Sequence, residues 1–409
     1  MKAYSTEYRR RSFLRWSLSA TVGVPSALAG ARNVLAEAAA TALPPVAPAA
    51  GDGAQGQVVI VPCVSYGAKV DSELRKSFDL LGGIGSLVKE KTVTVKVNLT
   101  GTNFTRFLNR PVGETFMTHY ATARALAAAL FEAGARRVRF VESTNSRAPL
   151  ETSLGYAGWD VKALEALGRV EFENTRNLGT GKRYAHMKVP AGGYLFSSFE
   201  FNHCYAETDV MVSLCKLKQH MAAGVTLSMK NQFGLTPNSL YGNEAVSEEA
   251  TVGRGPLHGA PGAALNLPGF KPGATSSDGS LVTRVIVDIC AARPIHLAII
   301  DGITAISGGE TPRSRHQQLT KPGILIVGFN PVCTDAVGTA AMGCSDPRAR
   351  KGTRPFNNCD NHLLLAEQVG LGTADLGKIE VLGLPLEKAP DRYPGTSDAG
   401  QSGGQEEQE

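Results

Sequence analysis

The chain has 409 residues, of which 43% are hydrophobic and 19% are charged, and its formal net charge is +5. Five basic residues and one acidic residue precede Ala31, so only about +1 remains for the rest of the chain. Nucleic-acid-binding proteins need a clustered basic surface, so this charge argues against that class. The length is sufficient for one large domain with a sizeable core.

The N-terminus resembles an export signal. Arg10 and Arg11 are followed by Ser12, Phe13 and Leu14, and a modestly apolar run then extends to Ala31. Paired arginines before a polar residue, Phe and Leu are typical of twin-arginine signals. The apolar run is too short and too rich in Gly, Ala and Ser to favour a membrane span. We therefore expect residues 1–31 to be a twin-arginine signal peptide, with the translocase as partner during export and a periplasmic or otherwise extracytoplasmic location.

Two low-complexity segments flank the expected folded part. Residues 32–56 are rich in Ala and Pro, which is typical of a linker. Residues 390–409 contain mostly polar residues and Gly, a composition too polar to pack into a core. We expect residues 57–389 to form a single large α/β domain, with no membrane span in the mature chain.

Seven cysteines, at positions 63, 204, 215, 290, 333, 344 and 359, include no C-x-x-C pair and no cluster of four. A four-cysteine iron–sulfur cluster or a zinc site built from thiolates alone is therefore not expected. Most of them lie in apolar patterns and are expected to be buried as small hydrophobic residues. Only Cys344 and Cys359, on either side of a polar loop, are placed for a disulfide. The sequence identifies no cofactor.

Patterns of apolar residues predict strands and helices in alternation. The expected strands cover residues 58–63, 92–97, 137–141, 170–172, 209–215, 295–300, 323–329 and 378–382. The expected helices cover residues 72–81, 119–133 after an N-cap at Thr118, 155–167, 222–233, 281–292, 335–342 and 361–369. This alternation predicts a mostly parallel, doubly wound sheet with helices on both faces.

Two segments depart from that alternation. Alternating large apolar residues between 182 and 201 predict an antiparallel hairpin around residues 191–193. Residues 238–280 are rich in Gly, Pro, Ser and Asn and show no periodicity. A segment of that length without structure of its own is usually a lid or binding loop, or else disordered, and we expect a lid.

The stretch around residues 209–235 organises the chain. A buried strand over residues 209–215 is followed at once by Lys216, Lys218 and His220. A helix over residues 222–233 is expected next, with Thr226 and Lys230 four positions apart on one face. Helix N-termini attract anions, and the preceding cations would strengthen that attraction. A solvated basic turn would give the same pattern, so the spacing alone leaves both interpretations open.

Polar residues follow several predicted strands at their carboxyl ends, where open parallel sheets bind ligands. They are Lys96 and Asn98, Glu142 with Ser143 and Asn145, Lys216, Lys218 and His220, Asp301, and Asn330. Lysine and asparagine side chains would hold an anionic oxygen, and His220 could transfer a proton. Glu142 or Asp301, if close to His220, would fix its tautomer and raise its pKa. His220, Glu142 and Asp301 are therefore the catalytic candidates.

Other motifs are absent or ambiguous. No G-x-G-x-x-G or Walker loop precedes a helix, and the sequence contains no G-x-S-x-G or H-E-x-x-H motif. His119 follows Thr118 and belongs either to a helix start on the surface or to the same site. A metal site formed by His119, His220, Glu142 and Asp301 is permitted by the spacing and not required by it. His258 could be brought to the site by the lid or could be exposed and mobile, and the other histidines, His362 among them, are expected to be structural.

Several of these motifs occur together, in the same order, in a known family. They are Lys96-Val-Asn98, Thr118-His119, Glu142-Ser143, Lys216-Leu-Lys218-Gln-His220, Gly224-Val-Thr226, Lys230-Asn231, Gly234-Leu235, Asp301-Gly302-Ile303, and Asn330-Pro331 with Asp335. The chain resembles the bacterial and archaeal domain-of-unknown-function family 362 from about Val58 to Leu382. The resemblance adds Asn231 to the substrate-binding candidates, which are then Lys96, Asn98, Lys216, Lys218, Thr226, Lys230, Asn231 and Asn330.

The resemblance limits what can be inferred about cofactors. Many relatives carry a ferredoxin-like module with clustered cysteines, which this chain lacks, so it resembles an exported variant without that module. The family's reaction is not established. One hypothesis is an enzyme that acts on a small carboxylate- or phosphate-bearing substrate by proton transfer or redox chemistry. The other is a non-catalytic periplasmic protein that binds an anion or a cofactor. An oriented acid or base would favour the enzyme, whereas a deep site with donors alone would favour binding.

Overall fold

A computed structural model describes residues 56–100, 102–259, 266–274, 281–313 and 317–389. All of these residues fall within one compact unit of the chain. The expected signal peptide, the tail, and nearly all of the expected linker lie outside the described residues. Within the described part, no helix is long and apolar enough to cross a membrane.

The core of the fold is an eight-stranded sheet. In spatial order its strands are β14 (Glu380–Gly383), β1 (Gln57–Pro62), β13 (Ile324–Gly328), β10 (Leu297–Gly302), β7 (Val210–Lys216), β2 (Thr92–Lys96), β3 (Arg137–Glu142) and β4 (Val170–Asn174). All neighbouring pairs are parallel except those of β13, which is antiparallel to both β1 and β10. The predicted α/β fold with a mostly parallel sheet is therefore confirmed.

The direction of β13 corrects one prediction. Because β13 is antiparallel to β10, its carboxyl end lies at the opposite edge of the sheet from the carboxyl ends of β2, β3, β7 and β10. Asn330 follows β13 at that opposite edge. Its side chain accepts hydrogen bonds from the N–H groups of Val332 and Cys333 and donates one to the Leu371 carbonyl. Asn330 is a helix cap and not part of the predicted strand-end site.

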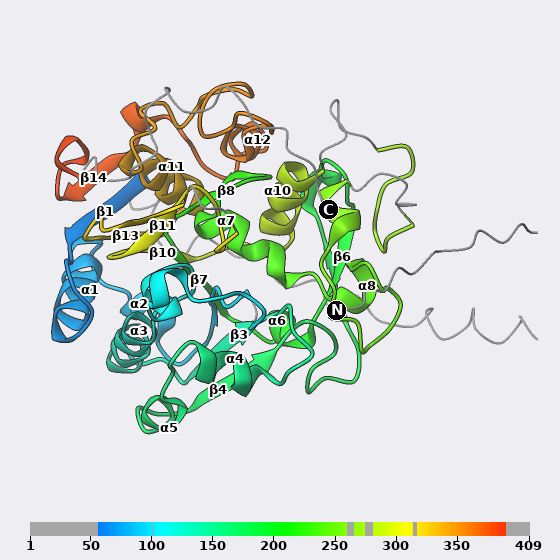
Figure 1. Cartoon of the computed structure of the whole chain (residues 1–409), viewed down its shortest axis with the longest axis horizontal. Helices are drawn as coiled ribbons and strands as arrows, with labels where there is room; N and C mark the ends of the chain where they lie inside the picture. Colours follow the sequence, from blue (N-terminus) through cyan, green and yellow to red (C-terminus); the bar gives the residue numbers. More distant parts are fainter. Residues whose placement is uncertain (1–55, 101, 260–265, 275–280, 314–316, 390–409) are drawn as a thin grey trace, which may run out of the picture. The chain divides into compact units, whose positions relative to one another are not determined.

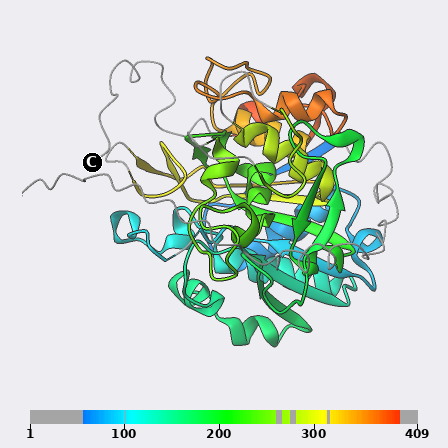
Figure 2. The ribbon, with the colours of Figure 1, turned by 90° about the vertical axis from the view of Figure 1, so that its right-hand side faces the viewer.

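Helices cover both faces of the sheet, as predicted. One core joins alternate strand residues to α1 (Ala68–Leu80), α2 (Gly85–Val88), α3 (Tyr120–Glu132), α4 (Leu150–Tyr156) and α5 (Val161–Glu165). The other joins the intervening residues to α7 (Leu227–Asn231), α10 (Val282–Ala292), α11 (Pro331–Ala341) and α12 (His362–Gln368). Successive strand residues point to opposite faces, which explains the two cores. Figures 1 and 2 show α11 and α12 on the other side of the sheet from α4 and α5.

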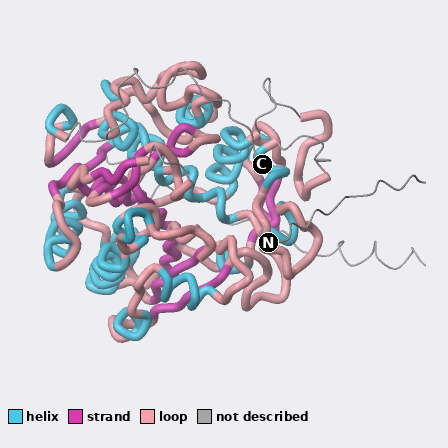
Figure 3. The backbone as a smooth tube through the Cα atoms, in the orientation of Figure 1, coloured by secondary structure: helices cyan, strands magenta, loops and turns pink. Residues whose placement is uncertain are grey.

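Small elements surround the main sheet, whose strands lie together between helices in Figure 3. The predicted hairpin is confirmed as the antiparallel pair β5 (Ala185–Lys188) and β6 (Ser198–Phe201), followed by α6 (His203–Ala206). Two further antiparallel pairs are β8 (Gln219–His220) with β9 (Gly224–Val225), and β11 (Ala305–Ser307) with β12 (Gln318–Thr320). Within the expected lid, the described residues form α8 (Asn238–Tyr241) and α9 (Gly255–His258).

Two helix predictions were too long. The helix expected over residues 155–167 is divided into α4 and α5, because Gly158 has a φ of +74° and Asp160 then caps α5 through the Ala163 N–H. The helix expected over residues 222–233 begins only at Leu227, since Gly224 has a φ of +76° within the β8–β9 pair.

The seven cysteines are all buried, and none of them is in a disulfide. The disulfide considered for Cys344 and Cys359 is therefore not formed. Burial raises the pKa of the Cys344 thiol, and the same effect acts on Cys204 and Cys215. Such neutral, enclosed thiols pack as small apolar groups, in agreement with the expectation from the apolar patterns around them.

Candidate functional site

Four strands deliver charged side chains to one edge of the sheet. Lys96, Glu142 and Lys216 are the last residues of β2, β3 and β7, and Asp301 is the penultimate residue of β10. Asp301 is paired in register with Lys216 on the neighbouring strand. Parallel strands therefore bring these predicted residues together. Helix α7 packs against β7 and β10, and Figure 1 shows these three elements near one another.

Lys216 and Asp301 form a buried ion pair. The Nζ atom of Lys216 lies 3.4 Å from Oδ2 of Asp301, and neither side chain is exposed. The lysine also donates to the Tyr66 hydroxyl at 2.7 Å and to the Gly113 carbonyl at 3.1 Å. The tyrosine hydroxyl in turn lies 3.0 Å from Oδ1 of Asp301, and Thr122 donates to Oδ2 at 3.1 Å. An ammonium has three N–H donors, so Lys216 has none left for a ligand.

His119 packs next to the Lys216–Asp301 ion pair and does not simply lie on the surface. Its ring stacks on Tyr66 with a centroid distance of 3.5 Å and an interplanar angle of 9°. Its Nδ1 accepts the Ala121 N–H, so His119 caps α3 in place of the predicted Thr118. Burial is the main cause that lowers the pKa of His119 to about 4, with Asp301 opposing the shift. The ring is therefore neutral at physiological pH.

Lys96 and Glu142 form a second buried ion pair. Their Nζ and Oε1 atoms are 2.6 Å apart, and the lysine also contacts the Val97 carbonyl at 2.6 Å and Oδ1 of Asn231 at 3.5 Å. Oε2 of Glu142 accepts the Leu99 N–H at 2.5 Å. A Cβ atom at Gly234 would lie 2.9 Å from Cε of Lys96, which explains glycine at that close approach. The donors of Lys96 are all engaged within the protein.

Lys218 is likewise saturated. Its Nζ atom donates to Oδ1 of Asn98 at 2.8 Å and to the carbonyls of Phe116 and Glu310 at 2.7 and 3.0 Å. Burial, opposed by the charge of Glu310, lowers the pKa of Lys218 to about 7. Lys218 therefore joins three loops. It has no N–H group left to donate to a ligand, so it can act on a ligand only through long-range electrostatic attraction.

The amide candidates and Thr226 also bond within the protein. Asn98 donates to Oδ1 of Asn231 at 3.1 Å, and Asn231 donates to the Lys96 carbonyl and to Ser213. The hydroxyl of Thr226 donates to the Gln219 carbonyl at 3.3 Å. These side chains fix the positions of the neighbouring loops and leave few groups for direct contact with a ligand.

The helix N-terminus predicted to bind an anion is already occupied. The carboxylate of Asp335 on α11 accepts the N–H groups of Ser228 and Met229, each at 2.8 Å, and the Ser228 hydroxyl. Burial raises the pKa of Asp335 to about 7, and these hydrogen bonds oppose the shift. A protein carboxyl group thus caps α7, and the expectation of an external anion there was wrong.

Lys230 differs from the other lysines at this edge. It is 9% exposed, and its Nζ atom lies 4.1 Å from the centroid of the Phe233 ring. Within the described part of the chain, no side chain or carbonyl accepts a hydrogen bond from it. Burial is the largest cause that lowers the pKa of Lys230 to about 7, with Arg254, Lys218 and Lys96 adding to it and Glu310 opposing it. Its donors remain available.

The charge that acts most strongly on His220 is that of Lys230 and not that of either carboxylate. No hydrogen bond joins His220 to Glu142 or Asp301 among the described residues, since both carboxylates bind lysines. Burial, followed by the charges of Lys230 and of His258, lowers the pKa of His220 well below its usual value. The Ala222 N–H donates to Nδ1 at 3.1 Å, so the neutral ring carries its hydrogen on Nε2. The predicted triad of His220, Glu142 and Asp301 is not assembled.

Arg254 and His258 from the expected lid and His362 from α12 all interact electrostatically with Lys230. The ring of His258 lies 4.8 Å from that of Phe233 and bonds through Nδ1 to the Arg254 carbonyl at 2.8 Å. Burial lowers the pKa of His258 to about 4 and that of Arg254 to about 10. His362 on α12 is fully buried, and burial together with Lys230 lowers its pKa to about 3.

The charges of this cluster do not balance. Lys96 and Lys216 have carboxylate partners. Glu310 raises the pKa of Lys218 and of Lys230, whereas the carboxylate that raises the pKa of Arg254 is Glu142, which is already paired with Lys96. Buried charges are normally paired. We call Lys230, His220, His258, Arg254 and Phe233 the Lys230 cluster.

No group of three or more His, Cys, Asp or Glu side chains suited to a metal occurs among the described residues. His119, His220, Glu142 and Asp301 therefore do not form the metal site that the spacing permitted.

Sequence reasoning missed Tyr66, Phe233, Arg254 and Glu310, and it treated His362 as structural. The segments of Tyr66, Arg254 and Glu310 carry no motif, and these residues reach the site only because distant loops pack over the strand ends, whereas Phe233 lies three positions after Lys230. One available signal was the position of Arg254 and His258 in the expected lid, where loop residues often serve a ligand.

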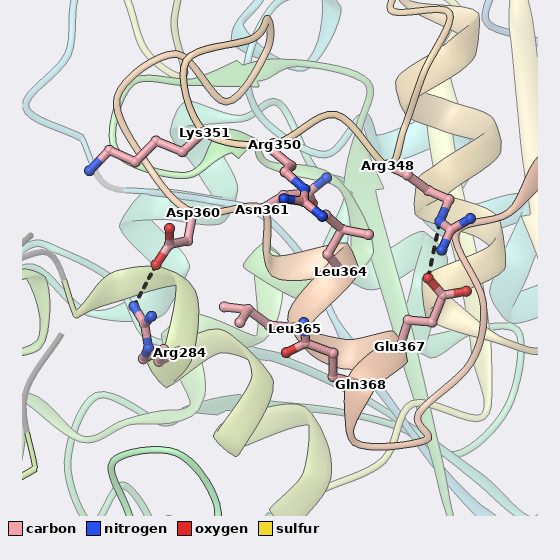
Figure 4. A pocket seen from close by; sticks show the side chains of 10 residues that line it. All are labelled: Arg284, Arg348, Arg350, Lys351, Asp360, Asn361, Leu364, Leu365, Glu367 and Gln368. Atoms are coloured by element: carbon pink, nitrogen blue, oxygen red, sulfur yellow. Dashed lines mark ion pairs between the residues drawn. The ribbon is translucent and has the colours of Figure 1, made fainter. Parts of the chain in front are cut away.

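A separate hollow of about 800 Å³ lies beside α12 (Figure 4). Its lining includes Arg284, paired with Asp360 at 2.7 Å, and Arg348, paired with Glu367 at 3.3 Å. Figure 4 shows the Arg350 side chain above Asn361 in this hollow. This hollow is basic, but exposed or half-buried side chains form most of it. A variant in this hollow can therefore serve as a control in anion-binding experiments.

No curated protein matches the chain. The model of the domain of unknown function DUF362 matches residues 93–340, which is more than half of the chain and includes β2, β3, β7, β10 and the Lys230 cluster. The chain therefore belongs to the DUF362 family.

Proposed function

We propose that the protein binds a small anion at the Lys230 cluster. The observation that carries this proposal is the buried ammonium of Lys230, which has no acceptor in the described part of the chain and lies among further cationic groups. Charge-assisted hydrogen bonds from Lys230 and Arg254 to an anion would supply the missing negative charge. Carboxylate and phosphate groups both fit this requirement.

A second candidate function is catalysis on such an anion. The pKa of Lys230 is about 7, and groups that titrate near neutral pH in a buried site serve as general bases or nucleophiles. His220 was the expected acid or base, but its pKa is far below the neutral range, so Lys230 is the better candidate for proton transfer. Binding of the anion is common to both candidates.

The proposal includes export. The arginine pair at positions 10 and 11 supports passage through the twin-arginine translocase to the periplasm or another extracytoplasmic space, as an exported variant without a ferredoxin module. The chain carries no cluster of four cysteines, which supports the assignment to that variant.

Isothermal titration calorimetry with inorganic phosphate and with succinate tests the binding function. We expect saturable binding of at least one probe to the mature protein, and native mass spectrometry of protein recovered after export should show which anion is retained. The variant Arg350→Met removes a cation from the separate hollow and should bind equally well. Loss of binding in Arg350→Met, or no binding of either probe to the wild type, would refute the proposal.

A further inference from the structure

The amine of Lys230 differs from the other lysine amines at this edge of the sheet in its hydrogen bonding. Lys96, Lys216 and Lys218 each direct three N–H donors at protein acceptors, whereas Lys230 lies over the Phe233 ring with no acceptor among the described residues. In its unprotonated form such an amine has a lone pair that no neighbouring donor occupies. That is the arrangement required of a nucleophilic lysine.

The surroundings favour the unprotonated amine. Arg254 on the expected lid, Lys218 after β7 and Lys96 on β2 all oppose a further positive charge, and Glu310 acts in the other direction. Together with burial they lower the pKa of Lys230 to about 7, so roughly half of the amine is neutral near physiological pH.

The two histidines of the Lys230 cluster present complementary groups. The Ala222 N–H fixes His220 as the tautomer with hydrogen on Nε2, and that N–H has no partner within the described residues. His258 bonds the Arg254 carbonyl through Nδ1, so its Nε2 carries a lone pair. A neutral imidazole N–H is an effective donor to a substrate carbonyl oxygen, and burial keeps both rings neutral.

We propose that Lys230 condenses with the carbonyl group of a small oxo acid, an aldehyde or ketone that also carries a carboxylate, to form an imine. This inference rests on the proposed anion site, which would hold the carboxylate. The amine lone pair forms the C–N bond, the carbonyl C–O bond breaks, and the oxygen leaves as water with both hydrogens of the amine. The imine then takes up one proton from solvent, and no oxidant or reductant is needed. Arg254 binds the carboxylate, and the N–H of His220 polarises the carbonyl group.

Reductive trapping tests the inference. The mature protein is incubated with pyruvate and sodium cyanoborohydride, and adducts are located by intact mass and peptide mapping. We expect a single adduct at Lys230, formed at least about 10-fold faster than on any exposed lysine because the amine is half neutral. Acetone, which lacks the carboxylate, should label Lys230 slowly, and succinate should compete with pyruvate.

Two matched variants decide the assignment. Lys230→Arg keeps the positive charge but forms no imine, so the adduct should disappear while succinate still binds. Lys188→Arg changes an exposed lysine of β5 and should leave the adduct unchanged. An adduct that persists in Lys230→Arg, or that is spread over exposed lysines, overturns the inference. If succinate or phosphate binds to the wild type but pyruvate gives no adduct, the imine is rejected and the anion site stands. If neither anion binds and pyruvate gives no adduct, both are rejected.

Discussion

The Nζ atom of Lys216 lies 3.4 Å from Oδ2 of Asp301, and both side chains are completely buried. The two residues are opposite each other on the parallel strands β7 and β10. Tyr66 and Thr122 satisfy further lone pairs of the carboxylate. This pair therefore joins two central strands, and its lysine is a structural residue even though it belongs to the most distinctive motif of the sequence.

Replacing Lys216 by methionine should destabilise the fold. The change leaves the Asp301 carboxylate buried without its charge partner, which typically costs about 3–5 kcal/mol. Urea denaturation followed by circular dichroism measures this loss. The control is Arg75→Met, which breaks the exposed pair with Glu132, where a loss of about 1 kcal/mol or less is expected. A Lys216→Met protein that unfolds like the wild type would show that Lys216 is not needed for the fold.

Replacing Lys230 by methionine should act on binding and not on folding. The variant loses a charge-assisted contact of about 1.5–3 kcal/mol, so affinity for succinate or phosphate should fall roughly 10- to 100-fold. Without an anion the variant should be at least as stable as the wild type, because it loses a buried ammonium that has no acceptor among the described residues. Calorimetry and urea denaturation report the two effects separately. Unchanged affinity in Lys230→Met would move the anion site elsewhere.

The sheet was predictable because each strand is a short apolar run with a turn signal after it. The edge that gathers Lys96, Glu142, Lys216 and Asp301 followed from parallel strands alone. Asn330 was misplaced because an apolar strand such as β13 has the same sequence pattern in either direction. Direction depends on the connections, which single-strand periodicity does not encode.

The roles of the lysines were less predictable. Lys218 follows the end of β7 and Lys230 lies within α7, yet Lys218 has three acceptors and Lys230 has none among the described residues. Two of the acceptors of Lys218 are backbone carbonyls from distant loops, at Phe116 and Glu310, and carbonyls leave no signature in a sequence. Asp335 likewise fills the N-terminus of α7 from more than 100 positions away, a contact that only the packing of α11 on α7 creates.

Limited proteolysis should cut first within residues 243–249. These residues are all exposed, Val246 to the extent of 88%, and they lie between the buried Gly242 and Ala250. A glutamate-specific protease should slow when succinate is bound, because Arg254 follows closely and the anion would add a contact to those it already makes with Thr236 and Ser143. First cleavage in the β5–β6 hairpin, or cleavage that succinate does not slow, would contradict a lid role for this segment.

Export should depend on the arginine pair. The double variant Arg10→Lys, Arg11→Lys should remain in the cytoplasm as an uncleaved precursor, because the translocase recognises the two arginines. Cell fractionation and immunoblotting measure the precursor and the processed form, with Arg15→Lys as the control that keeps the pair. Processed double variant outside the cytoplasm would mean that the N-terminus is a different kind of signal.

Anion affinity should fall as pH rises above neutrality. Without ligand, the pKa of Lys230 is about 7, so the free site is largely unprotonated at higher pH. A bound anion favours the ammonium and raises this pKa, so binding takes up a proton between pH 7 and the raised value. Affinity should then decrease by up to about 10-fold per pH unit in that window and stay nearly constant just below pH 7.

Calorimetry in two buffers of different ionisation enthalpy measures this proton uptake directly. Because His220, His258 and His362 have pKa values well below 6.5, they remain neutral in the window and contribute little to the slope. Lys230→Met should lose most of the pH dependence, whereas the exposed Lys188→Met should retain it. A slope that survives in Lys230→Met would assign the titration to Lys218, which has the same pKa of about 7 but already donates to three acceptors. Affinity that rises with pH would contradict a cationic site altogether.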